Sequence, residues 1–205
     1  MFIHLNCHSY YSLLEGTGSI EHLVDAASSV GCEALALTDT NNLYGAVAFY
    51  RQTEKAGIQP IFGTEIQCEN GERAVLLAKN MNGFGEVCRV ITDRQLKEDF
   101  SLTERLKECG RDVILLCSDA NMALEIIKER GTKDLAVELV PHEGIQFYQL
   151  MAFAREHRIP SVASGPSPPC STSTRRATFR ASASMGVSRS LKIMSRPMAR
   201  TCASS

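Results

Sequence analysis

Short apolar runs alternate with amphipathic stretches along the first 165 residues. An apolar run between turn signals is typical of a buried strand, whereas apolar residues at helical spacing indicate a helix with one buried face. The runs that predict strands cover residues 2–7, 34–39, 58–67, 73–78, 113–118, 135–140 and 160–164. The stretches that predict helices cover residues 19–30, 43–56, 84–109 (a helical pair), 120–130 and 144–157.

This alternation predicts an α/β fold. Strands that alternate with helices of about 10–15 residues indicate βα units and a parallel sheet. Six or seven units within 165 residues favour a closed or nearly closed barrel over a doubly wound open sheet, which remains the alternative. In either architecture, functional side chains gather at the C-terminal ends of the strands.

The composition changes at residue 166. Residues 166–205 contain six Arg, one Lys, ten Ser and no acidic residue, and they show no sustained period. Such a segment cannot bury enough apolar area to offset its chain entropy, so we predict a disordered basic tail after a domain of residues 1–165. Two explanations of the tail stay open: translation out of frame from about Gly165, or a genuine basic arm that contacts phosphate.

Compartment and membrane contact can be predicted from the same composition. No run of about 18 apolar residues exists, and the N-terminus lacks the basic and apolar regions of a signal peptide. The eight cysteines form no Cys-x-x-Cys pair, which favours reduced thiols. We therefore predict a cytoplasmic protein without a membrane segment.

Polar residues with metal-binding chemistry follow three of the predicted strands. The first strand ends in His4-Leu5-Asn6-Cys7-His8, in which residues 4, 6 and 8 share one face. A His-x-His pair there would hold a metal ion, but position 6 is Asn. Asp39 and Glu65 end the next strands and are candidate ligands or general bases, although such residues are also common in loops and helix caps. From the residues alone, a metal site and a solvated barrel mouth both remain open.

Several linked motifs occur in a fixed order. They are His-Leu-x-x-His-Ser at residues 4–9, Tyr-Ser-Leu-Leu-Glu-Gly at 11–16, Ala-Leu-Ala-Leu-Thr-Asp at 34–39, Ala-Gly-Ile-x-Pro-Ile-x-Gly-x-Glu at 56–65 and Leu-Leu-Ala-Lys-Asn at 76–80. Together they resemble the N-terminal PHP (polymerase and histidinol phosphatase) domain of bacterial DNA polymerase III alpha subunits, over residues 1–165. The resemblance implies a distorted β/α barrel of about seven mostly parallel strands, here incomplete at its C-terminal end.

The resemblance also implies a function. Active PHP domains hold about three metal ions at the strand ends and hydrolyse phosphoesters, whereas degraded ones serve as a structural platform. Of the family ligands, His8 and Glu65 are retained and His142 is a less certain match, with Asp39 nearby. The family's other histidine positions fall on residues that are poor ligands for a transition metal. These lost positions are Asn6, Thr40, a position near Ala74 and the closing Asp-x-His, which is replaced by Pro166-Ser167-Pro168.

The remnant ligand set predicts a platform domain of a DNA polymerase III alpha chain, with no cofactor or at most a divalent Zn, Mn or Mg ion. The parent family is a DNA-directed DNA polymerase, whose polymerase active site this chain lacks. The implied partners are the polymerase domains of a parent chain and a proofreading subunit, with DNA contacted only through the parent polymerase. The alternative function is a stand-alone metal-dependent phosphoesterase.

Overall fold

Six strands form one sheet in the described part of the chain, which is residues 3–140 and 144–164 of this computed structural model. The strands are β1 (Ala34–Leu37), β2 (Gln59–Gln67), β3 (Arg73–Ala78), β4 (Val113–Cys117), β5 (Leu135–Leu139) and β6 (Ser161–Ala163). The helices described are α1 (Ile20–Ser29), α2 (Ala46–Ala56), α3 (Met81–Leu96), α4 (Leu102–Lys107), α5 (Ala120–Arg130) and α6 (Ile145–Glu156).

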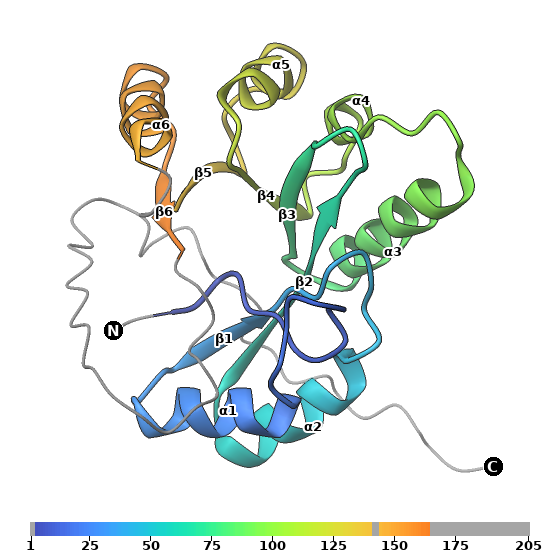
Figure 1. The fold of residues 1–205 in the computed structure, drawn as a ribbon, viewed down its shortest axis with the longest axis vertical. Coiled ribbons are helices and arrows are strands. Elements are labelled where there is room, and N and C mark those ends of the chain that lie inside the picture. Colours follow the sequence, from blue (N-terminus) through green and yellow to red (C-terminus); the bar gives the residue numbers. More distant parts are fainter. Residues whose placement is uncertain (1–2, 141–143, 165–205) are drawn as a thin grey trace.

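The sheet follows chain order from β1 to β6. The pairs β1–β2, β4–β5 and β5–β6 are parallel, whereas β3 runs antiparallel to both β2 and β4. Figure 1 shows the sheet curled into a half-barrel with β1 and β6 at its two edges and the helices outside it. The predicted α/β barrel-type fold with mostly parallel strands is thereby confirmed. The predicted tail at 166–205 lies outside the described residues.

The prediction of a regular strand at residues 2–7 is wrong. Residues 3–9 run beside β1, but they form a single isolated bridge, between His4 and Leu35. Further along, the N–H of Cys7 donates to the side-chain Oγ1 of Thr38 (2.8 Å) instead of to a backbone carbonyl. A side chain therefore takes the place of a ladder hydrogen bond, and six strands are described where about seven were predicted.

The remaining elements agree with the prediction to within a few residues. Helix α1 is capped by Ser19, whose side chain accepts from the N–H of His22, and Gly31 follows it with a positive φ of 71°. Helix α2 begins three residues later than predicted. The side-chain amide of Asn42 donates to two backbone carbonyls, of Tyr11 and Thr40, and thereby holds the preceding residues in a loop.

Alternation along the strands separates two apolar layers. Outward side chains pack under helices α3 to α6, as Leu76 and Val137 do. Inward side chains form a smaller cluster on the concave face, which includes Val75 and Ala136. Because successive side chains of a strand point to opposite faces, polar residues in step with the inward set must face the inside of the half-barrel.

Candidate functional site

Three charged side chains project from strand positions on the concave face. Glu65 of β2, Arg73 of β3 and Glu138 of β5 are each in step with inward apolar residues of their own strand. The side chains of Glu65 and Glu138 are only 3% and 1% exposed, whereas that of Arg73 is 29% exposed. Two buried carboxylates and one arginine thus lie together at one end of the sheet.

The Glu65 carboxylate is surrounded by protein donors. Its Oε1 accepts from Nε of Arg73 (2.8 Å) and from Nε2 of Gln67 (2.5 Å). Its Oε2 accepts from Nδ2 of Asn6 (2.8 Å) and lies 3.4 Å from Nε2 of His8. Both oxygens that a metal ion would use are therefore already hydrogen-bonded.

The Glu138 carboxylate is satisfied in the same way. Its Oε2 accepts from Nη2 of Arg73 at 3.0 Å. Its Oε1 accepts from Nδ2 of Asn6 (3.0 Å) and from Oγ of Ser164 (2.7 Å). One amide of Asn6 and one guanidinium of Arg73 therefore each bridge Glu65 and Glu138, and we call these four residues the Arg73 cluster.

The surroundings of Glu65 and His8 shift the pKa of each side chain toward its charged form. Burial alone would raise the pKa of Glu65, but the hydrogen bond with His8, the charge of Arg73 and the amides of Gln67 and Asn6 outweigh it and lower the pKa to about 2. Burial alone would lower the pKa of His8, but its hydrogen bond with Glu65 and the nearby carboxylates raise it. Glu65 is thus an anion at neutral pH.

A second group of polar residues lies around His8. Its Nδ1 is 3.1 Å from Oγ of Ser12 and 3.3 Å from Oγ1 of Thr40, and Thr40 in turn donates to Oε2 of Glu15 (2.5 Å). His8, Glu15 and Glu65 each offer one ligand atom, and these atoms all lie within 4.8 Å of one another. We call these three residues the His8 trio, which has the spacing for a single metal ion.

Asp39 takes a different place from the one expected of a ligand. It is buried, and its two carboxylate oxygens accept from the N–H of Ser9 (2.7 Å), Oγ of Ser9 (2.8 Å) and Oγ of Ser12 (2.8 Å). Asp39 thereby fastens the loop after residue 8 to the end of β1. Its predicted role as a metal ligand stays a prediction.

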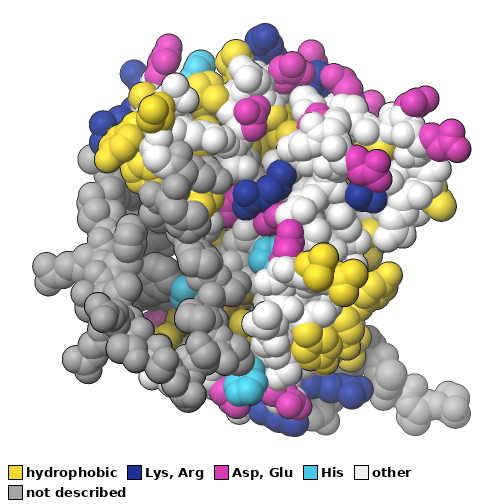
Figure 2. All heavy atoms as spheres, in the orientation of Figure 1, with side chains coloured by type: hydrophobic (Ala, Val, Ile, Leu, Met, Phe, Trp, Pro, Cys, Tyr) yellow, Lys and Arg dark blue, Asp and Glu magenta, His cyan; other side chains and the backbone are white. Residues whose placement is uncertain are grey.

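The structure brings together most of the residues singled out from the sequence. His8, Glu65, Asn6 and Thr40 meet at one end of the sheet through the contacts above, whereas His142 lies outside the described residues. Figure 2 shows basic, acidic and histidine side chains gathered in the middle of one face.

Sequence reasoning missed Arg73, Glu138 and Glu15. Glu138 carried a usable signal, because it is the one charged residue in the apolar strand Leu135–Leu139. Arg73 carried none, since an arginine at the start of a strand is usually solvated. Glu15 lies in a loop, where an acidic residue needs no special explanation.

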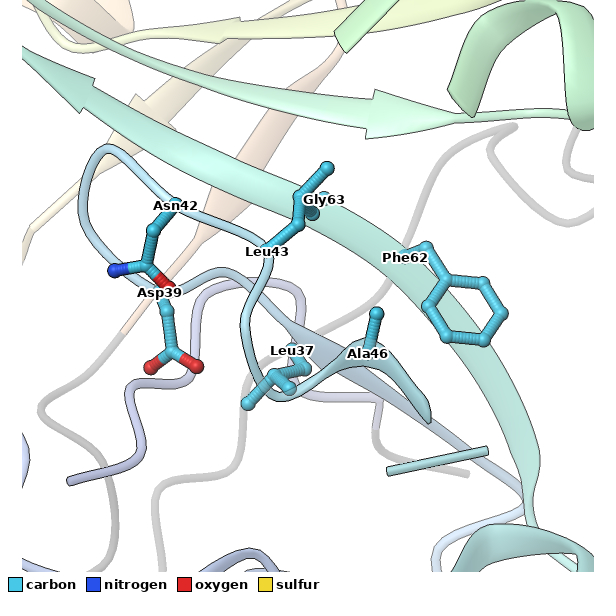
Figure 3. Close-up of a pocket in the computed structure, with 7 residues that line it drawn as sticks. All are labelled: Leu37, Asp39, Asn42, Leu43, Ala46, Phe62 and Gly63. Atoms are coloured by element: carbon cyan, nitrogen blue, oxygen red, sulfur yellow. The ribbon is translucent and has the colours of Figure 1, made fainter. Parts of the chain in front are cut away.

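A small depression lies beside this site (Figure 3). It is lined by Leu37, Asp39, Asn42, Leu43, Ala46, Phe62 and Gly63. Its walls are mostly apolar, and it is packed too tightly to admit a water molecule. This depression therefore offers no place for a substrate.

Comparison with known proteins identifies the family. The PHP domain family matches residues 4–149. An error-prone DNA polymerase of Symbiobacterium thermophilum is 43% identical over 98 residues, which are 48% of this chain and 9% of that protein. A DNA polymerase III subunit alpha of Chlamydia pneumoniae is 33% identical over 151 residues, which are 67% of this chain and 12% of that protein.

Solved structures agree at the level of the fold. An amidohydrolase from Chromobacterium violaceum superposes with a TM-score of 0.58 at 13% identity, covering 82% of this chain and 92% of that one. A two-domain protein from Bacteroides vulgatus, which contains a predicted PHP-like metal-dependent phosphoesterase, gives a TM-score of 0.52 at 14% identity, covering 80% and 52%.

This chain belongs to the PHP domain family. Its curated relatives include DNA polymerase III alpha subunits and error-prone DNA polymerases, which confirms the resemblance drawn from the motifs. The chain spans only 9–12% of the length of the two relatives described above. No helix among the described residues is long and apolar enough to cross a membrane.

The residues in the described part of the chain do not fit a cluster of about three metal ions. Two positions expected to carry imidazoles are Asn6 and Thr40, and the guanidinium of Arg73 lies between the inner carboxylates of Glu65 and Glu138. An amide and a hydroxyl are weaker ligands than imidazole for Zn. Among residues 3–140 and 144–164, the His8 trio is the group that retains ligand spacing, and that spacing suits a single ion.

Proposed function

We propose that this chain is a PHP platform domain of a DNA polymerase of the DNA polymerase III alpha or error-prone type, with little or no phosphoesterase activity of its own. The observation that carries the proposal is the Arg73 cluster, in which protein donors contact every oxygen of Glu65 and Glu138. In multi-metal hydrolysis the metal ions lower the pKa of a bound water and offset the charge of the phosphate, and carboxylates hold those ions in place. Here Glu65 and Glu138 hold the guanidinium of Arg73 between them instead.

An exposed apolar surface supports a platform role. Tyr10, Leu13 and Leu14 of the loop before α1 are 50%, 85% and 99% exposed, and Tyr44 and Val47 near the start of α2 are 73% and 65% exposed. We call these five residues the loop patch. Figure 2 shows hydrophobic side chains gathered on this side of the molecule. Contiguous exposed apolar surface of this kind marks a contact with another protein surface.

The backbone conformation of the loop patch also supports a contact role. Leu14 has a φ of 67°, a left-handed conformation that is costly for a leucine, and its side chain is almost fully exposed. The relatives extend far beyond the matched region, so a PHP domain in such a protein adjoins other parts of the polymerase. We therefore assign the loop patch to contact with the polymerase domains of a parent chain. The predicted contacts with a proofreading subunit and with DNA belong to that whole assembly.

A phosphoesterase assay tests the missing activity. The chain is incubated with a generic phosphomonoester and with Mn²⁺ or Zn²⁺, and hydrolysis is compared with that of Glu65→Ala. We expect no metal-dependent turnover in either protein. Metal-dependent turnover that disappears in Glu65→Ala would refute the non-catalytic role.

A chimaera tests the platform role. Residues 1–164 replace the matching region of the Symbiobacterium relative, and polymerase activity is measured after mild heating. We expect Leu14→Lys in the loop patch to lower the surviving activity, whereas Leu96→Lys leaves it unchanged. Leu96 is the matched control because it is 77% exposed at the end of α3, outside the loop patch. Equal survival of the two variants would argue against the loop patch as the contact.

The second candidate function is a single-metal phosphoesterase, and the His8 trio favours it. A lone ion could still lower the pKa of a bound water and act as a Lewis acid. Glu15→Gln decides between the two functions, because Glu15 belongs to the trio but makes no contact with Arg73 or Glu138 among the described residues. Loss of a metal-dependent turnover in this variant would support the phosphoesterase.

A further inference from the structure

We infer that the guanidinium of Arg73 is a built-in cation that takes the place of a metal ion between Glu65 and Glu138. The inference rests on the proposed non-catalytic function and extends it, since it says what replaced the metal. The inference concerns how the negative charges of two buried carboxylates are compensated. It is therefore tested by measurements of stability and metal binding, not by turnover.

The position of Arg73 follows from the sheet register. Arg73 pairs with Gln67 at the end of the β2–β3 ladder, two residues beyond the Glu65–Val75 pair. It shares the inward face with Val75 and Leu77, so its side chain crosses the concave face toward β5. Nε then meets Glu65 at 2.8 Å and Nη2 meets Glu138 at 3.0 Å. The guanidinium thus spans two carboxylates that come from different strands.

Arg73 is the arginine that contacts both buried carboxylates, and their other hydrogen-bond donors are mostly neutral. In the described part of the chain, the other hydrogen-bond donors to the Glu138 carboxylate are the side chains of Asn6 and Ser164, which are neutral. Glu65 has neutral donors in Asn6 and Gln67 and a histidine contact at 3.4 Å. Arg73 therefore supplies the permanent positive charge that two nearly fully buried carboxylates require.

A guanidinium suits this role because its planar fork offers several N–H donors in fixed directions and keeps its charge at all ordinary pH values. A divalent ion between the two carboxylates would have to occupy the space that the guanidinium fills, and the two positive charges would repel each other. Arg73 and an ion that bridges Glu65 and Glu138 are thus mutually exclusive. Removal of the guanidinium should leave two buried anions without a cation and open the position to a divalent ion.

The test compares thermal unfolding of the full chain and of Arg73→Met, each with 1 mM EDTA and with an excess of Mn²⁺. Methionine keeps the apolar stem and removes the charge. We expect Tm of the unsubstituted chain to be the same in both conditions. We expect Arg73→Met to unfold about 5–15 °C lower in EDTA and to recover a large part of that loss in Mn²⁺. Mn²⁺ is the chosen probe because it prefers oxygen ligands.

Two further variants make the result specific. Arg105 bridges Glu86 and Asp93 elsewhere in the molecule, so Arg105→Met should lose some stability and regain none of it in Mn²⁺. In Arg73→Met/Glu138→Gln, one of the two carboxylates becomes neutral, and recovery in Mn²⁺ should disappear. These controls separate a metal at the Arg73 cluster from a general effect of Mn²⁺ on acidic surfaces.

Arg73→Lys covers the case in which Arg73→Met fails to fold. Lysine keeps the charge but not the fork, so it should unfold at a lower temperature than the unsubstituted chain and gain nothing from Mn²⁺. The inference is overturned if Mn²⁺ raises Tm of the unsubstituted chain through Glu138, if Arg73→Met gains nothing, or if Arg73→Lys gains as much as Arg73→Met. None of these results would change the outcome of the phosphoesterase assay. The non-catalytic role and the built-in cation can therefore be refuted independently of each other.

Discussion

Two arginines in this chain each bridge two carboxylates, and their surroundings differ. Arg73 contacts Glu65 and Glu138 at 2.8 and 3.0 Å, and those side chains are 3% and 1% exposed. Arg105 contacts Asp93 and Glu86 at 2.7 and 2.8 Å, and those side chains are 27% and 13% exposed. The bond lengths are nearly equal, so they do not distinguish the two bridges.

Burial of the carboxylates and sequence separation distinguish the two bridges, although the side chain of Arg105 is itself less exposed (13%) than that of Arg73 (29%). The Arg105 bridge joins α3 to α4 over at most 19 residues, and water can solvate its carboxylates when the arginine is lost. The Arg73 bridge joins β2, β3 and β5, and Glu138 is 65 residues away from Arg73. Its carboxylates are almost completely shielded from water while the guanidinium is in place. The same pair of contacts therefore links two helices through partly exposed carboxylates in one place and acts as an internal counter-ion in the other.

The largest effect should come from removing the internal counter-ion. Arg73→Met should lower the free energy of unfolding by about 3–5 kcal/mol, because it leaves buried carboxylates without a cation. Urea unfolding in EDTA measures this change. A loss below about 1 kcal/mol would show that the Arg73 cluster behaves like a surface ion pair and would remove the contrast with Arg105.

Acid should weaken the Arg73 cluster over a defined pH range. The pKa of Glu65 is about 2 in the folded chain against an ordinary value of 4.5. Its contribution is therefore fully present above pH 4.5 and is lost as the pH falls toward 2, by about 3 kcal/mol at 1.36 kcal/mol per pKa unit. Urea unfolding between pH 5 and 2.5 should show a steeper loss for the unsubstituted chain than for Glu65→Gln. Parallel curves would contradict the lowered pKa.

Loss of the Arg105 bridge should lower the stability less than loss of Arg73. Arg105→Met should cost about 1 kcal/mol, since partly exposed ion pairs contribute little and are screened by salt. Unfolding at 0.05 M and 1 M NaCl measures both the loss and its screening. A loss as large as that of Arg73→Met would mean that burial does not decide the strength of these bridges.

Metal removal should have the smallest effect. Exhaustive dialysis against EDTA should leave the free energy of unfolding of the unsubstituted chain unchanged, because Arg73 supplies the charge that a metal would supply. Circular dichroism during urea unfolding, before and after dialysis, gives the comparison. Loss of stability on dialysis, restored by Zn²⁺ or Mn²⁺, would point to a structural metal at the His8 trio instead.

Much of the fold was predictable from the sequence. β3 (Arg73–Ala78) and α5 (Ala120–Arg130) were predicted with the observed bounds, because a continuous apolar run and a clean helical period have one reasonable interpretation each. The segment at residues 2–7 was misjudged, since pattern alone does not show that a threonine side chain will replace a backbone hydrogen bond. The antiparallel orientation of β3 was likewise not predictable, because the alternation of strands and helices indicates parallel strands.

The site was only partly predictable. His8 and Glu65 could be picked out because they follow apolar runs and match the family motifs. Arg73 and Glu138 could not, because their importance comes from a contact between strands that are 65 residues apart in the chain. A charged residue within a strand shows its role only when its inward neighbours are known. What replaces a lost metal is therefore a property of the folded sheet.

The most direct test of the built-in cation is a titration of Mn²⁺ with protein, followed through the electron paramagnetic resonance signal of free Mn²⁺. The account predicts that the unsubstituted chain binds no Mn²⁺ that depends on Glu138, whereas Arg73→Met removes about one equivalent of free Mn²⁺ and Arg73→Met/Glu138→Gln does not. Binding of Mn²⁺ by the unsubstituted chain that is lost in Glu138→Gln would contradict it.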